Sequence, residues 1–309
     1  MIYTVTLNPA IDYCMYPEGP LLPGETNRSR REEAFVGGKG NNVSRVLRGL
    51  GCESVAMGFC AGFTGDEILR GLEEAGIRTD YVRLSSGCSR INVKLKSPGK
   101  GDTGVTVLET EINGSGPEVP EEAQESFLAK IAGLREGDTL VLSGSVPGSL
   151  PADFYERILK SLPCDGIRTV VDAAGDLLRS CLPYGPFLVK PNLAELEQIT
   201  GRSLVSLEEI TAAADALAQQ GAQHVLVSLG AAGAILCSGG ECIRREAPKG
   251  TLVNSVGSGD SMVAGFLAAI SQGRKLQEAL KFAVAAGSAT AFTSDLATGK
   301  QIRELYQSM

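Results

Sequence analysis

Residues 254–266, NSVGSGDSMVAGF, place one carboxylate, that of Asp260, at the junction of a glycine-rich turn and an apolar helix. The first N–H groups of a helix have no partner within it, and glycines let a ligand approach them closely. The segment is therefore typical of an anion cradle that carries a base. Capping of the helix by Ser258 and Asp260 is the structural alternative, and this segment alone does not decide between them.

A second glycine-rich segment, GGKGNN at residues 37–42, precedes the helical pattern VSRVLRGL. It holds Lys39 among backbone amides and lacks the spacing of a Walker A loop, so a polyhydroxylated or phosphorylated ligand would suit it. Asp12 follows the first predicted strand, at the edge where open α/β sheets bind ligands. The guanidinium of Arg90 suits phosphate recognition. Taken singly, Lys39 is equally a solvated lysine on a flexible loop, whereas such an Asp12 is more often a turn residue and such an Arg90 more often a solvated charge.

Two further segments suit a nucleotide and its metal. Asn192 and Glu195 lie three residues apart at a predicted helix start, where their oxygens could bind magnesium through water. The same spacing also fits a capping box, which is purely structural, and the spacing favours neither. Residues 228–233, SLGAAG, form a glycine turn after an apolar strand and would let a nucleotide approach the backbone.

Short apolar runs alternate with segments of helical periodicity along most of the chain, which predicts a parallel sheet covered on both faces. The predicted strands are residues 2–7, 139–144, 168–173, 187–192 and 224–230, and the predicted helices are residues 42–50, 66–75, 152–162, 207–220 and 261–271.

Two insertions, at about residues 10–36 and 88–114, have a different pattern. The second alternates polar and apolar residues around a predicted turn at residues 98–101. Strict alternation indicates strands with one solvated face, so we expect the insertions to pair into a small separate sheet that acts as a lid. A hairpin with no function is the alternative.

The composition excludes some classes of function. The chain has 309 residues, of which 43% are apolar, and a formal charge of −7, which disfavours binding to nucleic acid. A signal-peptide pattern and an apolar stretch of the roughly 20 residues that span a membrane are both missing, so we expect a cytoplasmic protein without membrane association. Eight cysteines without a CxxC pair predict reduced, mostly buried thiols.

Taken together and in order, eight segments resemble the ribokinase-like, or PfkB, carbohydrate kinases over nearly the whole chain. They are TLNPAID (6–12), GGKGNN (37–42), SRINVKL (89–95), TEIN (110–113), LSGSVP (142–147), KPNLAELE (190–197), SLGAAGA (228–234) and VGSGDSMVAGF (256–266). The resemblance implies one domain over residues 1–309, a three-layer α/β/α fold with a mainly parallel central sheet and a small β-sheet lid. Within the family, the segments look most like its 1-phosphofructokinases, with tagatose-6-phosphate kinases as the sibling group.

The resemblance implies ATP-dependent phosphorylation of a ketohexose phosphate, D-fructose 1-phosphate first and D-tagatose 6-phosphate as the alternative. Asp260 would be the base, with the amides of Gly257, Ser258 and Gly259 as the anion hole. Substrate would contact Asp12, Gly38, Lys39, Asn42, Arg90 and Asn92. ATP would contact Lys190, Asn192, Ser228, Gly230, Gly233, residues 256–259 (Val256, Gly257, Ser258 and Gly259) and backbone around residues 283–287, and Mg²⁺ would be held by Asn192 and Glu195 through water.

The resemblance also bears on the assembly. Some relatives pair their lids, so a homodimer through the lid is one expected arrangement.

Two other functions would require different residues from those in this sequence. A non-catalytic sugar-phosphate sensor would not need Asp260 or the glycine cradle, and the chain has both. A nicotinamide dehydrogenase would have GxGxxG after its first strand, where this chain has Asn-Pro-Ala-Ile-Asp.

Overall fold

A computed structural model of the chain describes residues 1–101 and 104–309. Its main sheet has ten strands in the order β14-β13-β12-β11-β10-β9-β1-β4-β5, with β6 also paired to β4. Neighbours from β12 through β5 are parallel, and β13 and β14 add an antiparallel hairpin at one edge. The strands are β1 (Ile2–Thr6), β4 (Ser54–Ala61), β5 (Arg78–Thr79), β6 (Val82–Leu84), β9 (Thr139–Ser143), β10 (Arg168–Asp172), β11 (Leu188–Val189), β12 (His224–Ser228), β13 (Ala234–Ser238) and β14 (Glu241–Arg245).

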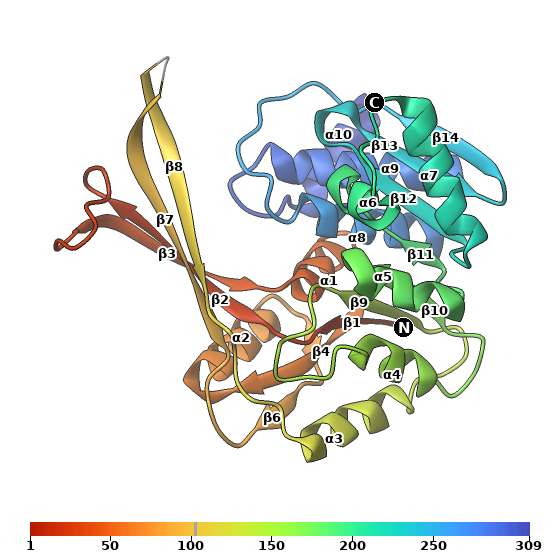
Figure 1. Ribbon diagram of the computed structural model, residues 1–309, viewed down its shortest axis with the longest axis horizontal. Coiled ribbons are helices and arrows are strands. Elements are labelled where there is room, and N and C mark those ends of the chain that lie inside the picture. Colours follow the sequence, from red (N-terminus) through yellow and green to blue (C-terminus); the bar gives the residue numbers. More distant parts are fainter. Residues whose placement is uncertain (102–103) are drawn as a thin grey trace.

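Helices cover both faces of this sheet, as the strand and helix alternation predicts (Figure 1). The sheet strands carry apolar side chains on both faces: Leu142 belongs to the core under one set of helices and Val141 to the core under the other. The first set comprises α3 (Glu121–Ile131), α4 (Phe154–Lys160), α5 (Gly175–Cys181), α6 (Leu193–Thr200) and α7 (Leu207–Gln219). The second comprises α1 (Lys39–Gly49), α8 (Ser258–Ser271), α9 (Leu276–Ala291) and α10 (Gly299–Ser308).

The expected three-layer architecture is thus confirmed. Strand β4 is the longest strand of the main sheet that the sequence did not predict. Residues 54–61 are all buried, so they show no alternation from which periodicity could identify a strand. Within the described residues, no helix has both the length and the apolar character needed to cross a membrane.

A separate four-stranded sheet, here called the lid, projects from the main body (Figure 1). Its order is β3-β2-β7-β8, formed by β2 (Ala10–Pro17), β3 (Ser29–Gly37), β7 (Arg90–Gly101) and β8 (Gly104–Asn113). The predicted second sheet is confirmed. Helix α2 (Gly62–Glu74) packs under its base, where Ile68 and Leu72 share a core with Ile11.

The turn predicted at residues 98–101 is wrong, because these residues continue strand β7 in register with β8. The connection falls at residues 102 and 103, outside the described residues. Pairing of β7 with β2 ends at Leu95, so Pro98 has a strand neighbour on one side only. A proline, which cannot donate a backbone hydrogen bond, is tolerated at such an edge.

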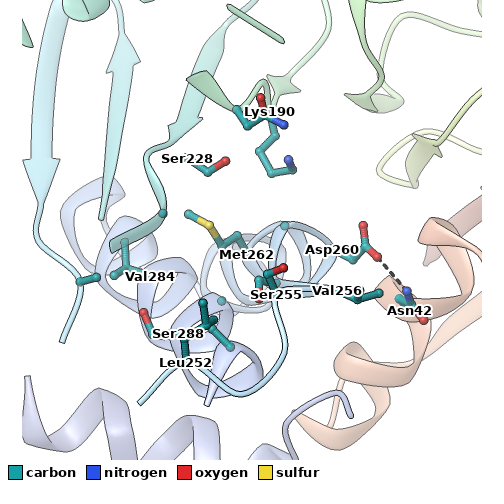
Figure 2. A pocket seen from close by; sticks show the side chains of 18 of the residues that line it. Asn42, Lys190, Ser228, Leu252, Ser255, Val256, Asp260, Met262, Val284 and Ser288 are labelled. Atoms are coloured by element: carbon teal, nitrogen blue, oxygen red, sulfur yellow. Dashed lines mark hydrogen bonds between the residues drawn. The ribbon is translucent and has the colours of Figure 1, made fainter. Parts of the chain in front are cut away.

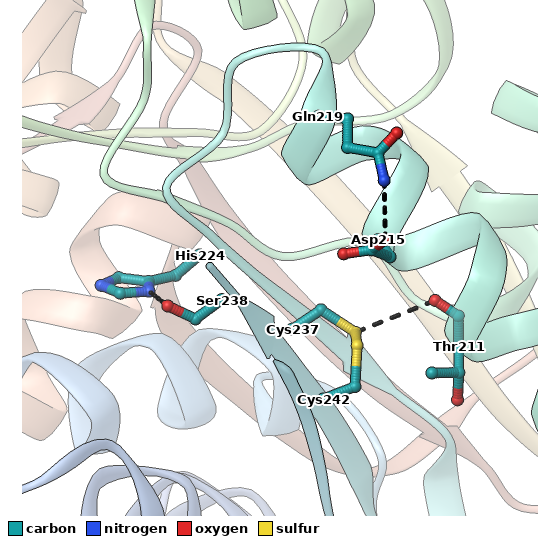
Figure 3. The surroundings of a disulfide bond; sticks show 7 residues. All are labelled: Thr211, Asp215, Gln219, His224, Cys237, Ser238 and Cys242. Atoms are coloured by element: carbon teal, nitrogen blue, oxygen red, sulfur yellow. Dashed lines mark hydrogen bonds between the residues drawn. A yellow bond between two sulfur atoms is a disulfide. The ribbon is translucent and has the colours of Figure 1, made fainter. Parts of the chain in front are cut away.

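The expectation that all eight cysteines are reduced is also wrong. Cys237 and Cys242 form a disulfide between directly opposite positions of β13 and β14, with their Cα atoms 4.1 Å apart (Figure 3). The pairing depends on strand register across the Gly239–Gly240 turn, which cysteine spacing alone does not reveal. The six free cysteines are Cys14, Cys60 and Cys181, which are buried, Cys52, which is half-buried, and Cys88 and Cys164, which are exposed.

Candidate active site

One pocket of about 870 Å³ lies between the carboxyl ends of the central strands and the lid. The starts of α1 and α8 enter it, and the loop after β14 borders it. All residues selected from the sequence line this pocket: Asp12, Gly38, Lys39, Asn42, Arg90, Asn92, Lys190, Asn192, Glu195, Ser228, Gly230, Gly233, Val256, Gly257, Ser258, Gly259 and Asp260. The structure therefore brings together residues from opposite ends of the chain, while their individual roles stay predictions.

The glycine turn before α8 leaves backbone amides open. Gly257 occupies the N-cap position with φ 78°, in the left-handed region that favours glycine, and no side chain of residues 1–101 or 104–309 caps the helix. The amide of Ser258 closes the turn by donating to the Ser255 carbonyl at 3.3 Å. Within the described part of the chain, the amides of Gly257 and Gly259 have no such acceptor. The capping alternative for Ser258 and Asp260 is therefore wrong, and the open amides fit an anion.

Asp260 lies on the first turn of α8 and is only 5% exposed. Its Oδ2 accepts a hydrogen bond from Asn42 Nδ2 at 2.8 Å (Figure 2). Burial, followed by the negative charge of Asp172, raises the pKa of Asp260 to about 6, although the Asn42 hydrogen bond and two nearby lysines oppose this shift. Such a carboxylate is ionised at neutral pH but is more basic than an exposed one, which suits a general base.

Asp172, which the sequence reasoning missed, is buried at the carboxyl end of β10 and also lines the pocket. Its Oδ1 lies 3.2 Å from Lys190 Nζ and 3.5 Å from Lys39 Nζ, so one carboxylate holds a lysine from each side of the site. Burial lowers the pKa of Lys39, but nearby carboxylates, with Asp172 first, outweigh it and raise the pKa above its ordinary value. The available signal was an acid that ends a buried strand at the ligand-binding edge.

The lid supplies the opposite wall. Asp12 Oδ1 accepts a hydrogen bond from Asn92 Nδ2 at 2.8 Å, between neighbouring strands β2 and β7. A Cβ atom at Gly37 would lie 2.9 Å from the Asp12 carboxylate, so glycine there leaves the space that the carboxylate needs. Arg90 Nε donates to the Asn8 carbonyl at 3.1 Å, and burial lowers the pKa of the guanidinium. Among described residues, Arg90 forms no ion pair, so its remaining N–H groups suit an anionic ligand.

The other end of the pocket is more apolar. Leu252, Met262 and Val284 surround it, with Ser228 and Ser288 at its border, whereas Val256 lies beside Asp260 and Asn42 (Figure 2). Leu252 is 68% exposed, which is unusual for an aliphatic side chain and suits contact with a flat ring. Val284 and Gly287 of α9 line this end, where late-helix backbone was expected. Sequence reasoning missed the loop at residues 247–252, which has no motif.

Asn192 and Glu195 form a complete capping box at the start of α6, each side chain accepting from the other's amide at 2.8 Å. The structural alternative for this pair is therefore present, and both residues also line the pocket. Among the residues described, no group of three or more His, Cys, Asp or Glu side chains is placed to hold a metal ion. Magnesium usually keeps several waters and binds one or two carboxylates together with substrate phosphates, so the Glu195 carboxylate, which lines the same pocket as Lys190, fits a nucleotide-borne ion.

Comparisons with known proteins agree with this architecture. Residues 5–303 match the pfkB family of carbohydrate kinases. The chain is 44% identical to the 1-phosphofructokinase of Bacillus subtilis over 99% of this chain and 97% of the relative. It is 36% identical to the D-tagatose-1-phosphate kinase of Bacillus licheniformis, over 96% and 94%. The solved structure of phosphofructokinase-2 from Escherichia coli, in complex with substrates and products, superposes with a TM-score of 0.90 at 28% identity, covering 99% of this chain and 98% of that one.

The chain therefore belongs to the pfkB family of carbohydrate kinases. It is an enzyme, a sugar-phosphate kinase with the ribokinase-like fold, and kinases of this family use ATP. The resemblance inferred from the eight sequence segments is confirmed.

Proposed function

We propose that the enzyme transfers the γ-phosphoryl group of ATP to the C6 hydroxyl of D-fructose 1-phosphate, giving D-fructose 1,6-bisphosphate and ADP. The observation that carries this proposal is the placement of the Asp260 carboxylate beside open helix amides, between an apolar slot and a lid whose Arg90 has no ion-pair partner among the described residues. The similarity to a 1-phosphofructokinase over almost the full chain supports the choice of substrate.

The sugar phosphate binds on the lid side of the pocket. Its C1 phosphate faces the free N–H groups of Arg90, and its hydroxyls donate to the Asp12 carboxylate and contact Gly38 and Asn42. Lys39, held by Asp172, faces the same space. These contacts orient the C6 hydroxyl toward Asp260, and orientation of this kind lowers the barrier without covalent chemistry.

The adenine occupies the apolar slot by Leu252 and Val284, and the phosphates run past Gly230, Gly233 and Lys190 toward α8. Asp260 accepts the C6 hydroxyl proton while the sugar oxygen forms a bond to the γ-phosphorus. The bond from that phosphorus to the β-phosphate oxygen breaks, and ADP leaves with the electron pair. Amides of residues 257–259 stabilise the negative charge on the transferring group.

Mg²⁺ fits this arrangement through Asn192 and Glu195, by way of water. When bound, it neutralises charge on the nucleotide phosphates. The capping box fixes both side chains by binding one oxygen of each, Asn192 Oδ1 and Glu195 Oε2, so the second Glu195 oxygen is the one that faces water.

A second candidate substrate is D-tagatose 1-phosphate, because one similar relative is named a D-tagatose-1-phosphate kinase. It carries its phosphate at C1, as fructose 1-phosphate does, and so differs from the tagatose 6-phosphate that the sequence suggested. The test is ADP release with equal concentrations of fructose 1-phosphate, tagatose 1-phosphate, tagatose 6-phosphate and fructose 6-phosphate. We expect the highest kcat/KM with fructose 1-phosphate; preference for either 6-phosphate contradicts the proposal, and no turnover with any of them favours a sensor.

We also propose a homodimer formed through the outer face of the lid, which points away from Asn92. Ile91, Leu108 and Ile112 share this face by strand register and are 40%, 55% and 61% exposed. Such an apolar patch is typical of a protein interface. Sedimentation should give twice the mass of the chain for the native protein, and Ile112→Glu should shift it toward the monomer; a monomeric native protein contradicts this arrangement.

A further inference from the structure

Strand β7 presents three polar side chains in succession on its site-facing side: Arg90, Asn92 and Lys94. The first two line the pocket, whereas Lys94 lies beyond Asp12 and borders a second cavity of about 1000 Å³ beneath the lid. Lys94 is only 8% exposed, which is rare for a lysine unless its charge is paired.

The Lys94 ammonium lies between two carboxylates. Its Nζ is 3.5 Å from Asp12 Oδ2 and 3.7 Å from Glu111 Oε1. Burial lowers the pKa of Lys94, but these two acids, with Asp12 first, raise it above its ordinary value, so the side chain is charged. The pair with Asp12 is more shielded than the pair with Glu111, because the side-chain exposures of these acids are 20% and 41%.

The Asp12 carboxylate is thus held at both oxygens, by Asn92 at Oδ1 and by Lys94 at Oδ2. Glycine at position 37 leaves space next to the Asp12 carboxylate that a Cβ atom would fill. No backbone amide of the described chain donates to this carboxylate. A carboxylate held at both oxygens in this way keeps its remaining lone pairs directed into the pocket. Its orientation depends on Lys94, a residue that does not line the pocket itself.

We infer that Lys94 is a positioning residue for sugar recognition, which acts by holding the Asp12 carboxylate oriented toward the substrate hydroxyls. This inference rests on the proposed function, because it assumes that Asp12 binds the sugar. It predicts that loss of the Lys94 charge weakens binding of the sugar phosphate and leaves binding of ATP and the chemical step nearly unchanged.

Lys96 provides the matched control. It lies two residues further along the same face of β7, is 23% exposed at its side chain, and pairs with Glu109 at 3.8 Å. Glu111→Gln is a second control, because it removes the other partner of Lys94 and leaves the pair with Asp12 intact.

The experiment first identifies the ketohexose phosphate that the native enzyme uses best and then measures KM for that sugar, KM for ATP and kcat in each variant. Lys94→Met should raise the sugar KM by roughly tenfold or more, as expected for loss of an interaction with a charged group, with kcat and the ATP KM within about threefold. Lys94→Arg should restore much of the affinity. Lys96→Met and Glu111→Gln should stay within about twofold of native.

A double-mutant cycle separates an effect through Asp12 from direct contact with the substrate. If Lys94 acts through Asp12, Lys94→Met should add little to the sugar KM when Asp12 is already Asn. A full additional increase in that background overturns the inference, as does an unchanged sugar KM in Lys94→Met alone. A native enzyme that uses none of the ketohexose phosphates overturns both the proposed function and the inference, whereas the variant results bear on the inference only.

Discussion

Asn42 Nδ2 donates to Asp260 Oδ2 across 2.8 Å, although the two residues are 218 positions apart. Asn42 lies in the first turn of α1 and Asp260 in the first turn of α8, and these helices pack in the same core. The bond therefore aligns the starts of two helices at one point. Both helix starts are preceded by glycines with positive φ, Gly38 and Gly257, so two electropositive ends face the same ligand space.

Asp260→Asn tests the assigned base. The variant keeps the size of the side chain, so we expect it to fold and to bind ATP, while kcat falls by about 10²–10⁴-fold because the proton acceptor is lost. Calorimetry with ATP and a coupled ADP assay measure the two quantities. Asp176→Asn, at a side chain that is 97% exposed, is the control and should match native. Retention of more than a tenth of native turnover contradicts the role of base.

The pKa of Asp260 is raised to about 6, mainly by burial, and it should set the acid limb of the pH profile of kcat/KM. Only the ionised form accepts a proton, so kcat/KM should fall as the pH drops through about 6. The Asn42 hydrogen bond lowers this pKa, so Asn42→Ala should move the acid limb to higher pH. Initial rates between pH 5 and 9 give both limbs; an identical acid limb in the variant would show that another group titrates.

Titration of Asp260 should also affect the stability of the fold, but in the opposite direction to activity: deprotonation raises kcat/KM and lowers the free energy of unfolding. Because the pKa of Asp260 is about 6 in the folded protein, against 3.8 for an exposed aspartate, the folded protein binds the proton more tightly than the unfolded chain. The cost of the buried charge is absent below about pH 4 and complete above about pH 6, where it amounts to about 3 kcal/mol. Asp260→Asn should therefore raise Tm relative to native at pH 8 but not at pH 4. Equal differences at both pH values would contradict this linkage.

Much of the site could be predicted because its residues lie in short motifs at strand ends and helix starts, where backbone geometry is local. Asp172, in contrast, is an unremarkable acid in RTVVDA until the parallel order of β9, β10 and β11 brings it beside Lys39 and Lys190. The same limit applies to the disulfide, which needs the register of β13 and β14. Contacts that depend on tertiary pairing leave no signal in sequence spacing.

The fold was predictable to a similar depth. Alternation of buried strands and amphipathic helices was enough for the layers, and alternating polarity was enough for the lid. Residues 98–101 contain proline and two glycines, which favour a turn locally, yet pairing with β8 extends the strand through them. The wholly buried β4 carries no periodic pattern at all.

Gly259→Ala tests whether the helix start serves as an anion cradle. An added Cβ would lie 3.1 Å from Lys190 Nζ, the movable end of a flexible side chain, so the fold should tolerate it. Alanine also favours helix over glycine, so Tm should stay equal or rise slightly. The methyl group would occupy the space beside the open amides, and kcat should fall by at least about tenfold, as for loss of an oxyanion-hole donor.

Gly148→Ala is the matched control for that variant, because a Cβ there meets nothing within 4 Å and should leave both Tm and kcat unchanged. A Gly259→Ala enzyme with native turnover would show that the phosphoryl group does not approach this part of the backbone. A Gly259→Ala protein that fails to fold would contradict the tolerance expected from the Lys190 contact.

The Cys237–Cys242 disulfide makes a prediction about thiol content and stability. Protein denatured without reductant should expose six thiols to a thiol reagent, and eight after reduction. The bridge closes a loop with a sequence separation of only 5, so the loop-entropy model limits its stabilisation to about 2 kcal/mol. Cys237→Ser should lower Tm further than Cys242→Ser, because Cys237 is completely buried and a hydroxyl there loses apolar packing, whereas residue 242 is partly exposed. Eight reactive thiols in the unreduced denatured protein would contradict the bridge.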